Sequence, residues 1–258
     1  MSVPICSYKA PKMKKIFCTT AGFLSQLASR ISKMRTYLGT WFILCFFLFG
    51  GNFTPLSAQS QLSIARLKYS GGGDWYSSKT ALPNLIKFCN RELGTSFQAQ
   101  ERIVEIGSDA IFQYPFCFLT GHGNVVFSEQ ETNNLRTYLQ SGGFLHICDN
   151  YGLNNYIRRE MKKVFPESEW LEIPYNHPIY KQRFSFPQGV PKIHEHDGKR
   201  AQGFGLFHKG KLVCFYDYES DLGNGWEDAE VYNDPESVRL QALRMGANLV
   251  QFALTSPK

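Results

Sequence analysis

The densest group of side chains that could do chemistry is the stretch His194-Glu195-His196-Asp197. In an extended segment His194 and His196 would point to the same side, because side chains alternate along a strand. Two imidazoles on one side could ligate a metal ion, with His122 as a third ligand. A self-contained, hydrogen-bonded loop is the alternative, because the spacing His-x-His alone is a weak signal.

Two further candidates follow apolar runs that are typical of buried strands. His122 follows the run 116–120 between two glycines, and Asp149 follows the run 144–148. His122 could act as a base or a ligand, and Asp149 or Glu195 could carry a proton in a hydrolase. A backbone turn that needs only its glycines is the alternative at His122. The sequence contains no GxSxG, GxCxG, HExxH or GxxxxGK motif, which leaves any nucleophile unassigned.

The segment YSGGGDWY at residues 69–76 stands where a phosphate-binding loop would, between a strand-like and a helix-like run. Tyr76 occupies the position of the third glycine of a dinucleotide loop, and Asp74 would place negative charge beside a phosphate. No nucleotide cofactor is therefore expected. The Asp74 carboxylate and the Trp75 ring suit a hydroxyl-rich ligand instead, while a tight turn with Trp75 packed over the core is equally compatible.

A third polar stretch contains Asp217, Glu219 and Asp221 in alternation. Three carboxylates on one side of a strand need a cation or hydrogen-bond donors nearby. The spacing superficially resembles a calcium loop, but Asp228 stands at the twelfth position, where a bidentate Glu would be needed. The favoured interpretation is a solvated acidic loop, with Asp221 as a candidate for the ligand site.

An alternation of apolar runs and amphipathic segments must position these residues. Strand, helix, strand and helix in succession predict a parallel sheet with helices on its faces. Ser128 and Glu131 form a capping box that predicts the start of one helix. Residues 170–205 interrupt the alternation with four prolines and several aromatic residues, which indicates a long, ordered, irregular insertion. The expected strands are 62–69, 102–106, 116–120, 144–148 and 211–216, and the expected helices are 82–93, 128–141, 157–165 and 235–253.

Residues 1–58 have the character of a secretory leader. They contain seven Lys and Arg, no Asp or Glu, and an apolar run near their end. Translation from Met34 would make residues 34–58 a signal peptide and residues 1–33 a start-site overcall. We expect a periplasmic or otherwise exported protein. The alternative is an anchor in the inner membrane through residues 37–56, if the leader is not cleaved.

Without the leader the charge is nearly balanced. Seven of the 28 Lys and Arg lie in residues 1–58, which leaves 21 against 22 Asp and Glu. No basic patch remains to predict a nucleic-acid partner, and contact with a membrane is expected only through an uncleaved leader. Residues 59–258 suit one domain. Its four cysteines stand in apolar runs and are expected to be buried: Cys89, Cys117, Cys148 and Cys214.

Four segments together resemble the bacterial domain of unknown function 4159: RLKYSGGGDWY at 66–76, FLTGHG at 118–123, PKIHEHD at 191–197 and DLGNGW at 221–226. The resemblance covers about residues 61–256. It implies export and a flavodoxin-like, three-layer α/β fold, similar to class I glutamine amidotransferase-like and trehalose-utilisation-like domains. The turn GHGN directly after the strand that contains Cys117 has no cysteine at the position of a nucleophile elbow, so amidotransferase chemistry is not implied.

We therefore expect a single flavodoxin-like domain that binds a small polar or carbohydrate-like ligand at the carboxyl ends of its strands. A metal-assisted hydrolase and a noncatalytic module that binds envelope proteins are the alternatives. If the candidate side chains lie within hydrogen-bonding reach of one another, ligand binding or hydrolysis is favoured over the noncatalytic module. The expected ligand-binding residues are Asp74, Trp75, His122, Asp149, His194, His196 and Asp221.

Overall fold

The computed structural model describes residues 62–256, so the expected leader at residues 1–58 lies outside the described residues. These residues form a seven-stranded sheet of order β2-β1-β3-β4-β7-β6-β5. The first five strands in that order run parallel, and their order is that of a flavodoxin-like doubly wound sheet. The strands are β1 (Ala65–Lys68), β2 (Arg102–Glu105), β3 (Phe116–Leu119), β4 (Phe144–Ile147), β5 (Leu171–Glu172), β6 (Phe204–His208) and β7 (Lys211–Tyr216).

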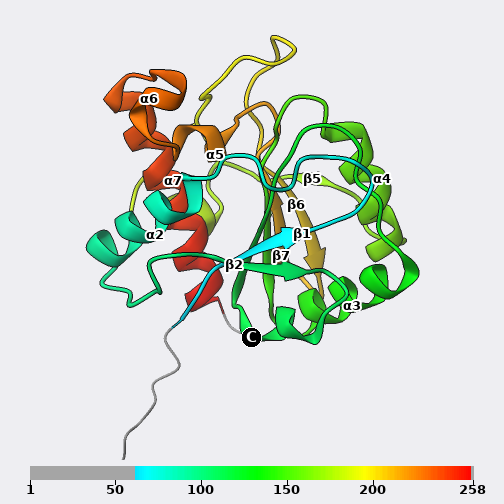
Figure 1. Cartoon of the computed structure of the whole chain (residues 1–258). Coiled ribbons are helices and arrows are strands. Elements are labelled where there is room, and N and C mark those ends of the chain that lie inside the picture. Colours follow the sequence, from blue (N-terminus) through cyan, green and yellow to red (C-terminus); the bar gives the residue numbers. More distant parts are fainter. Residues whose placement is uncertain (1–61, 257–258) are drawn as a thin grey trace, which may run out of the picture. The chain divides into compact units, whose positions relative to one another are not determined.

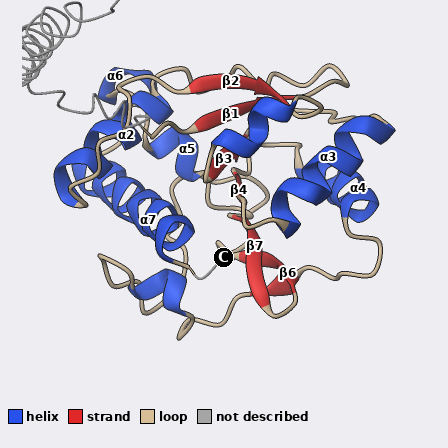
Figure 2. Cartoon of the chain, turned by 90° about the horizontal axis from the view of Figure 1, so that it is seen from below, coloured by secondary structure: helices blue, strands red, loops and turns tan. Residues whose placement is uncertain are grey.

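Helices cover both faces of the sheet, which gives three layers (Figure 1). Seen along the sheet, α2, α5 and α7 lie on one side and α3 and α4 on the other (Figure 2). The helices are α2 (Ala81–Glu92), α3 (Glu129–Gln140), α4 (Asn154–Val164), α5 (Leu222–Gly225), α6 (Ala229–Tyr232) and α7 (Glu236–Thr255), with 3₁₀ turns η1 (Asp109–Gln113) and η2 (Pro178–Lys181). The expected α/β fold is confirmed.

Alternation along the strands divides the apolar side chains between two cores. In β3, Phe116 and Phe118 pack with α2 and α7, whereas Cys117 and Leu119 pack with α3 and α4. All four residues are buried, as expected for a central parallel strand with helices on both faces. The four cysteines of the described region are likewise buried and unpaired. Across residues 62–256, no helix combines the length and the apolar character that crossing a membrane requires.

The capping box at the start of α3 is confirmed. Ser128 Oγ accepts from the backbone N–H of Glu131, and the Glu131 carboxylate accepts from the N–H of Ser128 at 2.7 Å. These two bonds satisfy N–H groups that have no partner inside the helix. The helix start could be predicted because the residues that define it are three positions apart.

The sheet is mixed, which corrects the expectation of parallel strands only. Strand β6 pairs antiparallel with β7, and β5 pairs antiparallel with β6. Lys209 and Gly210 join β6 to β7 with φ values of 49° and 78°. Positive φ at both central residues is the geometry of a type I′ hairpin turn, which matches the twist of paired strands. The end of the expected insertion therefore belongs to a hairpin.

The insertion at residues 170–205 is largely irregular, with β5 and η2 as its short regular elements. A buried amide on α7 fixes its middle. Asn248 Oδ1 accepts from the N–H groups of Arg183 and Phe184 at 3.0 and 2.9 Å, and its Nδ2 donates to the carbonyl of Phe184 at 2.7 Å. These bonds account for the order of a long loop within a packed domain.

Candidate functional site

The loops that follow β1 and β3 are joined at the carboxyl edge of the sheet. Ser70 forms an isolated antiparallel bridge with Val126, and the N–H of Gly73 donates to the carbonyl of Asn124 at 2.9 Å. Gly121 has a φ of 142°, and a Cβ there would collide with the Tyr69 hydroxyl. The glycines of the two loops thus allow close backbone packing.

Asp74 and His122 meet across this junction. The Asp74 carboxylate accepts the backbone N–H of His122, and its Oδ2 lies 3.0 Å from His122 Nδ1. Both side chains are partly exposed. Trp75, beside Asp74, packs against the core over α3 and α4. The pair therefore holds the loop after β1 against the loop after β3.

Arg66 of β1 also holds the loop that follows β1. Its guanidinium donates to the carbonyls of Ser77 and Ser78 at 2.8 and 2.9 Å and to Glu101 at 3.2 Å. The Arg66 side chain is only 3 % exposed. An arginine in such a position must satisfy its donors within the protein, and here backbone carbonyls supply two of the acceptors.

A second set of side chains joins histidines to carboxylates. His194 Nδ1 lies 3.1 Å from Asp221 Oδ2, and its Nε2 lies 2.9 Å from Asp234 Oδ2. His196 Nε2 lies 3.4 Å from Asp221 Oδ2, and its Nδ1 lies 3.6 Å from Asp149 Oδ2. Both nitrogens of each ring face a carboxylate, which suits an imidazolium with two N–H donors. We call these five side chains the His–Asp network.

The charges of the His–Asp network support one another. The nearby carboxylates of Asp149 and Asp221 together raise the pKa of His196 to about 10. Hydrogen bonding to Asp221 also raises the pKa of His194. Burial would by itself raise the pKa of Asp221, but the two histidines outweigh burial and lower it. Each imidazole of the network therefore stabilises the charge of the carboxylate beside it, and the carboxylates stabilise the charge of the imidazoles.

Unfolding should become easier as the pH rises from about 6.5 to 10. The unfolded imidazole loses its proton near pH 6.5, whereas folded His196 keeps it to about pH 10. The stability from this shift is therefore fully present below pH 6.5 and is lost on approach to pH 10. Allowing for solvent screening, we expect a loss of roughly 1–2 kcal/mol. Urea unfolding between pH 6.5 and 10 should show that the free energy of unfolding falls less in His196→Gln than in the unchanged protein. An equal fall in both proteins would contradict the prediction.

The acidic stretch after β7 is not solvated, so the interpretation as a solvated loop is wrong. Asp217, Glu219 and Asp221 are 0 %, 1 % and 2 % exposed. Hydrogen-bond donors from other parts of the chain stabilise these carboxylates. Asp217 accepts the N–H of Asp149 at 2.7 Å, and Glu219 binds Lys192 at 2.9 Å. Glu219 and Asp221 also have positive φ values of 57° and 65°. This strained turn persists because the surrounding contacts fix it.

Asn224 connects the His–Asp network to the loop that Arg66 holds. Its Nδ2 donates to Asp221 Oδ2 at 2.6 Å, and its Oδ1 accepts from Ser78 Oγ at 2.9 Å. Ser78 is one of the two residues whose carbonyls bind Arg66. The loops after β1 and β7 therefore share one polar connection through α5.

A pocket of about 280 Å³ lies over the network at the carboxyl ends of β4 and β7. Among its accessible groups are Tyr151, 62 % exposed, and the side chains of Lys199 and Asp197, 57 % and 54 % exposed and 3.9 Å apart. The Tyr151 ring stands edge-on to His196, with centroids 5.9 Å apart. We call this the strand-end pocket. Its lining comprises Asp149, Tyr151, Gly152, Asn154, Asn155, His196, Asp197, Lys199, Tyr218 and Glu219.

The structure brings the sequence-predicted residues together in two groups. Four of them meet in the His–Asp network, and two of these line the strand-end pocket. Asp74 and His122 form the other group, with Trp75 beside them, and the pocket lining includes none of these three. The turn after β4 approaches the loop after β3, because a Cβ on Gly152 would lie 3.9 Å from the backbone nitrogen of Gly123. The four residues of the network are Asp149, His194, His196 and Asp221.

The proton-carrier role considered for Glu195 in a hydrolase stays a prediction. Its carboxylate is largely exposed and lies 3.3 Å from Lys192 Nζ, apart from the two histidines. Within residues 62–256, no group of three or more His, Cys, Asp and Glu side chains is arranged to hold a metal ion. The metal-ligating role of His194, His196 and His122 stays a prediction, and only the first two lie together.

Three residues that line the pocket are not among the candidates from the sequence, because an aromatic ring and two amides carry no charge. Tyr151, Asn154 and Asn155 lie directly after β4, in the stretch DNYGLNN at residues 149–155. An aromatic ring and two amides immediately after a buried strand were a usable signal for a polar ligand. Asp234, the second partner of His194, stands 40 residues along the chain and carries no such signal.

One protein family matches nearly the whole described region. A family model described as a domain of unknown function (DUF4159) matches residues 63–254, a range that includes all seven strands. No curated protein is similar enough to the chain to count as a match.

Proposed function

The chain belongs to the DUF4159 family, and from this premise we propose that it binds a small, carbohydrate-like ligand in the strand-end pocket. Open α/β sheets bind ligands at the carboxyl ends of their strands, which is where this pocket lies. The observation that carries the proposal is the pairing of an exposed aromatic ring, Tyr151, with an exposed carboxylate, Asp197, in one small pocket.

The chemistry of the pocket suits a ligand rich in hydroxyl groups. A sugar ring has an apolar face, which the Tyr151 ring can cover, and hydroxyl hydrogens, which the Asp197 carboxylate can accept. The amide of Asn155 supplies a donor and an acceptor beside them, and Asn154 supplies a donor, because its Oδ1 already accepts from Arg158 Nε at 2.7 Å. A volume of about 280 Å³ stands near the lower end of the roughly 300–1,000 Å³ range of ligand pockets. The pocket therefore suits one sugar-sized unit.

The floor of the pocket is held rigidly. Asp149 Oδ1 accepts from the Tyr216 hydroxyl at 2.6 Å, and its Oδ2 accepts from the N–H of Glu219 at 2.7 Å. His196 lies between Asp149 and Asp221. Because these groups are already hydrogen-bonded to one another, they act as support, and a preformed floor lowers the entropy lost on binding.

We expect Tyr151→Ala to weaken saccharide binding about fivefold or more, because aromatic contacts of this kind contribute roughly 1 kcal/mol beyond the area they bury. Calorimetric titration with glucose, galactose, mannose and N-acetylglucosamine would measure the effect. Phe112→Ala is the matched control, since this exposed aromatic residue of η1 lies outside the pocket. If none of these sugars binds the folded protein at millimolar concentration, the proposal fails and a partner-binding module becomes the better interpretation.

The proposed function also includes export. The basic start and apolar centre of residues 34–58 support it, since they have the pattern of a signal peptide. An exported domain would meet carbohydrate at the cell envelope. Fractionation of the native host, with mass spectrometry of the mature N-terminus, would test both the location and the expected start near residue 59.

A further inference from the structure

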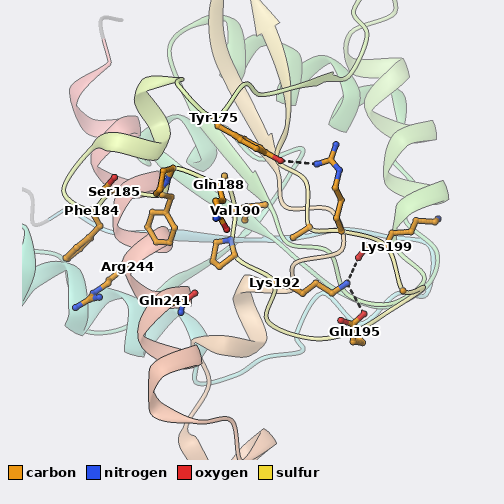
Figure 3. Close-up of a pocket in the computed structure, with 17 residues that line it drawn as sticks. Tyr175, Phe184, Ser185, Gln188, Val190, Lys192, Glu195, Lys199, Gln241 and Arg244 are labelled. Carbon is orange, nitrogen blue, oxygen red and sulfur yellow. Dashed lines mark hydrogen bonds and ion pairs between the residues drawn. The ribbon is translucent and has the colours of Figure 1, made fainter.

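A larger groove adjoins the strand-end pocket at Lys199, which lines both cavities, and Figure 3 shows the residues that line this groove. It has a volume of about 940 Å³ and runs between the segments 184–192 and 198–201 of the insertion and the exposed side of α7. Lys199 lines both cavities, while Asp197 lines only the pocket and Glu195 only the groove. The His194–Asp197 loop thus separates two cavities that share one wall residue.

The groove presents an aromatic ring that its surroundings hold in place. A Cβ on Gly189 would lie 2.9 Å from Cε1 of Tyr175, so only glycine allows the ring to lie where it does. The Tyr175 hydroxyl accepts a hydrogen bond from Arg200 at 3.4 Å (Figure 3). The residue remains 45 % exposed. Tyr175 therefore offers a fixed apolar surface at the groove, as Tyr151 does at the pocket.

The basic groups of the groove are mostly paired. Arg200 binds both oxygens of Glu172 at 2.7 Å, and Lys192 binds Glu219 at 2.9 Å. Paired charges of this kind attract a polyanion weakly, which disfavours an acidic peptide or a nucleic acid. The side-chain amides of Gln188 and Gln241 also line the groove. Amides, an aromatic ring and balanced charge suit a neutral chain that is rich in hydroxyl groups.

The walls of the groove are preformed. Asn248 of α7 holds the backbone of Phe184 through both its N–H and its carbonyl, and Phe184 lines the groove. The guanidinium of Arg244, on the same helix, lies 5.4 Å from the centre of the Phe184 ring. A ligand would therefore meet a surface that needs little ordering.

We propose that the groove receives the further units of an oligosaccharide whose end unit occupies the strand-end pocket. This inference rests on the proposed function and names its ligand class, a neutral oligosaccharide. The oligosaccharide would extend from the strand-end pocket, across the loop between the two cavities, into the groove. Tyr175 and Gln241 contact the added units. Tyr151 contacts the end unit alone.

The test compares monosaccharides with their trimers on the purified protein. Glucose, galactose, mannose and N-acetylglucosamine are each titrated beside the corresponding trimer. We expect at least one trimer to bind about tenfold or more tightly than its monomer. Tyr175→Ala should abolish this advantage and leave the monosaccharide affinity within twofold. Gln241→Ala, an exposed change on α7 that does not threaten folding, should reduce the same advantage.

The outcomes separate this inference from the proposed function. If monomer and trimer bind equally and neither variant changes either affinity, the groove inference is overturned while saccharide binding in the pocket stands. If no saccharide binds at all, both are overturned. If a peptide of glutamates binds the groove and no sugar displaces it, the occupant has been misidentified. The inference is then also overturned.

Discussion

Arg66→Met is expected to lower the free energy of unfolding by roughly 3–5 kcal/mol, because it removes one partner from a buried, hydrogen-bonded ion pair. Methionine keeps much of the volume but none of the donors. Glu101 would lose its cation, and the carbonyls of Ser77 and Ser78 would each lose a short hydrogen bond. Burying unsatisfied acceptors is costly, which makes this one of the largest single effects expected in the domain.

Lys68→Met is the matched control for that experiment. Lys68 lies on the same strand and binds Glu105 at 2.8 Å, but both side chains are exposed. Exposed pairs of this kind contribute about 0–1 kcal/mol. Urea unfolding of both variants measures the difference, and hydrogen exchange at residues 74–80 should accelerate only in Arg66→Met. Equal destabilisation by the two changes would show that Arg66 does not hold the loop.

The contacts of Arg66 also show why part of the site could not be predicted from the sequence. Two of its acceptors are backbone carbonyls, and every residue has one, so no pattern of side chains predicts them. By contrast, the capping box of α3 is visible because Ser128 and Glu131 stand three positions apart and act through local geometry. Information about a fold is easiest to read where the interacting groups are close in sequence.

The same reasoning applies to the strands and to the acidic stretch. The parallel strands were predictable because buried apolar runs alternate with amphipathic helices. The β6–β7 hairpin was missed, although Lys209-Gly210 between two apolar runs is a hairpin signal. Glu219 was misread as solvated because its partner, Lys192, is 27 residues away. Asp149 and His196, which form the pocket floor, are likewise distant in sequence and meet only through the sheet.

Asp221→Asn is expected to lower the free energy of unfolding by about 3–5 kcal/mol near pH 6, because it removes a buried charge from between two imidazolium groups. Asn keeps the shape of the side chain and tolerates the left-handed backbone at a φ of 65°. The change is therefore confined to charge and hydrogen bonding. His194 would keep Asp234, and His196 would keep Asp149, each with one carboxylate fewer.

The pKa of His196 separates a loss of charge from a loss of fold in this variant. Asp221 is one of the two carboxylates that raise this pKa to about 10, so it should fall toward the ordinary value near 6.5 in Asp221→Asn. NMR titration of the ring measures the shift, and the exposed change Asp109→Asn should leave both stability and pKa unchanged. A variant that unfolds easily but keeps the high pKa would contradict the mutual stabilisation of these charges. A fallen pKa with a folded domain would instead place Asp221 at the centre of the network, as the anion that holds both histidines beneath the strand-end pocket.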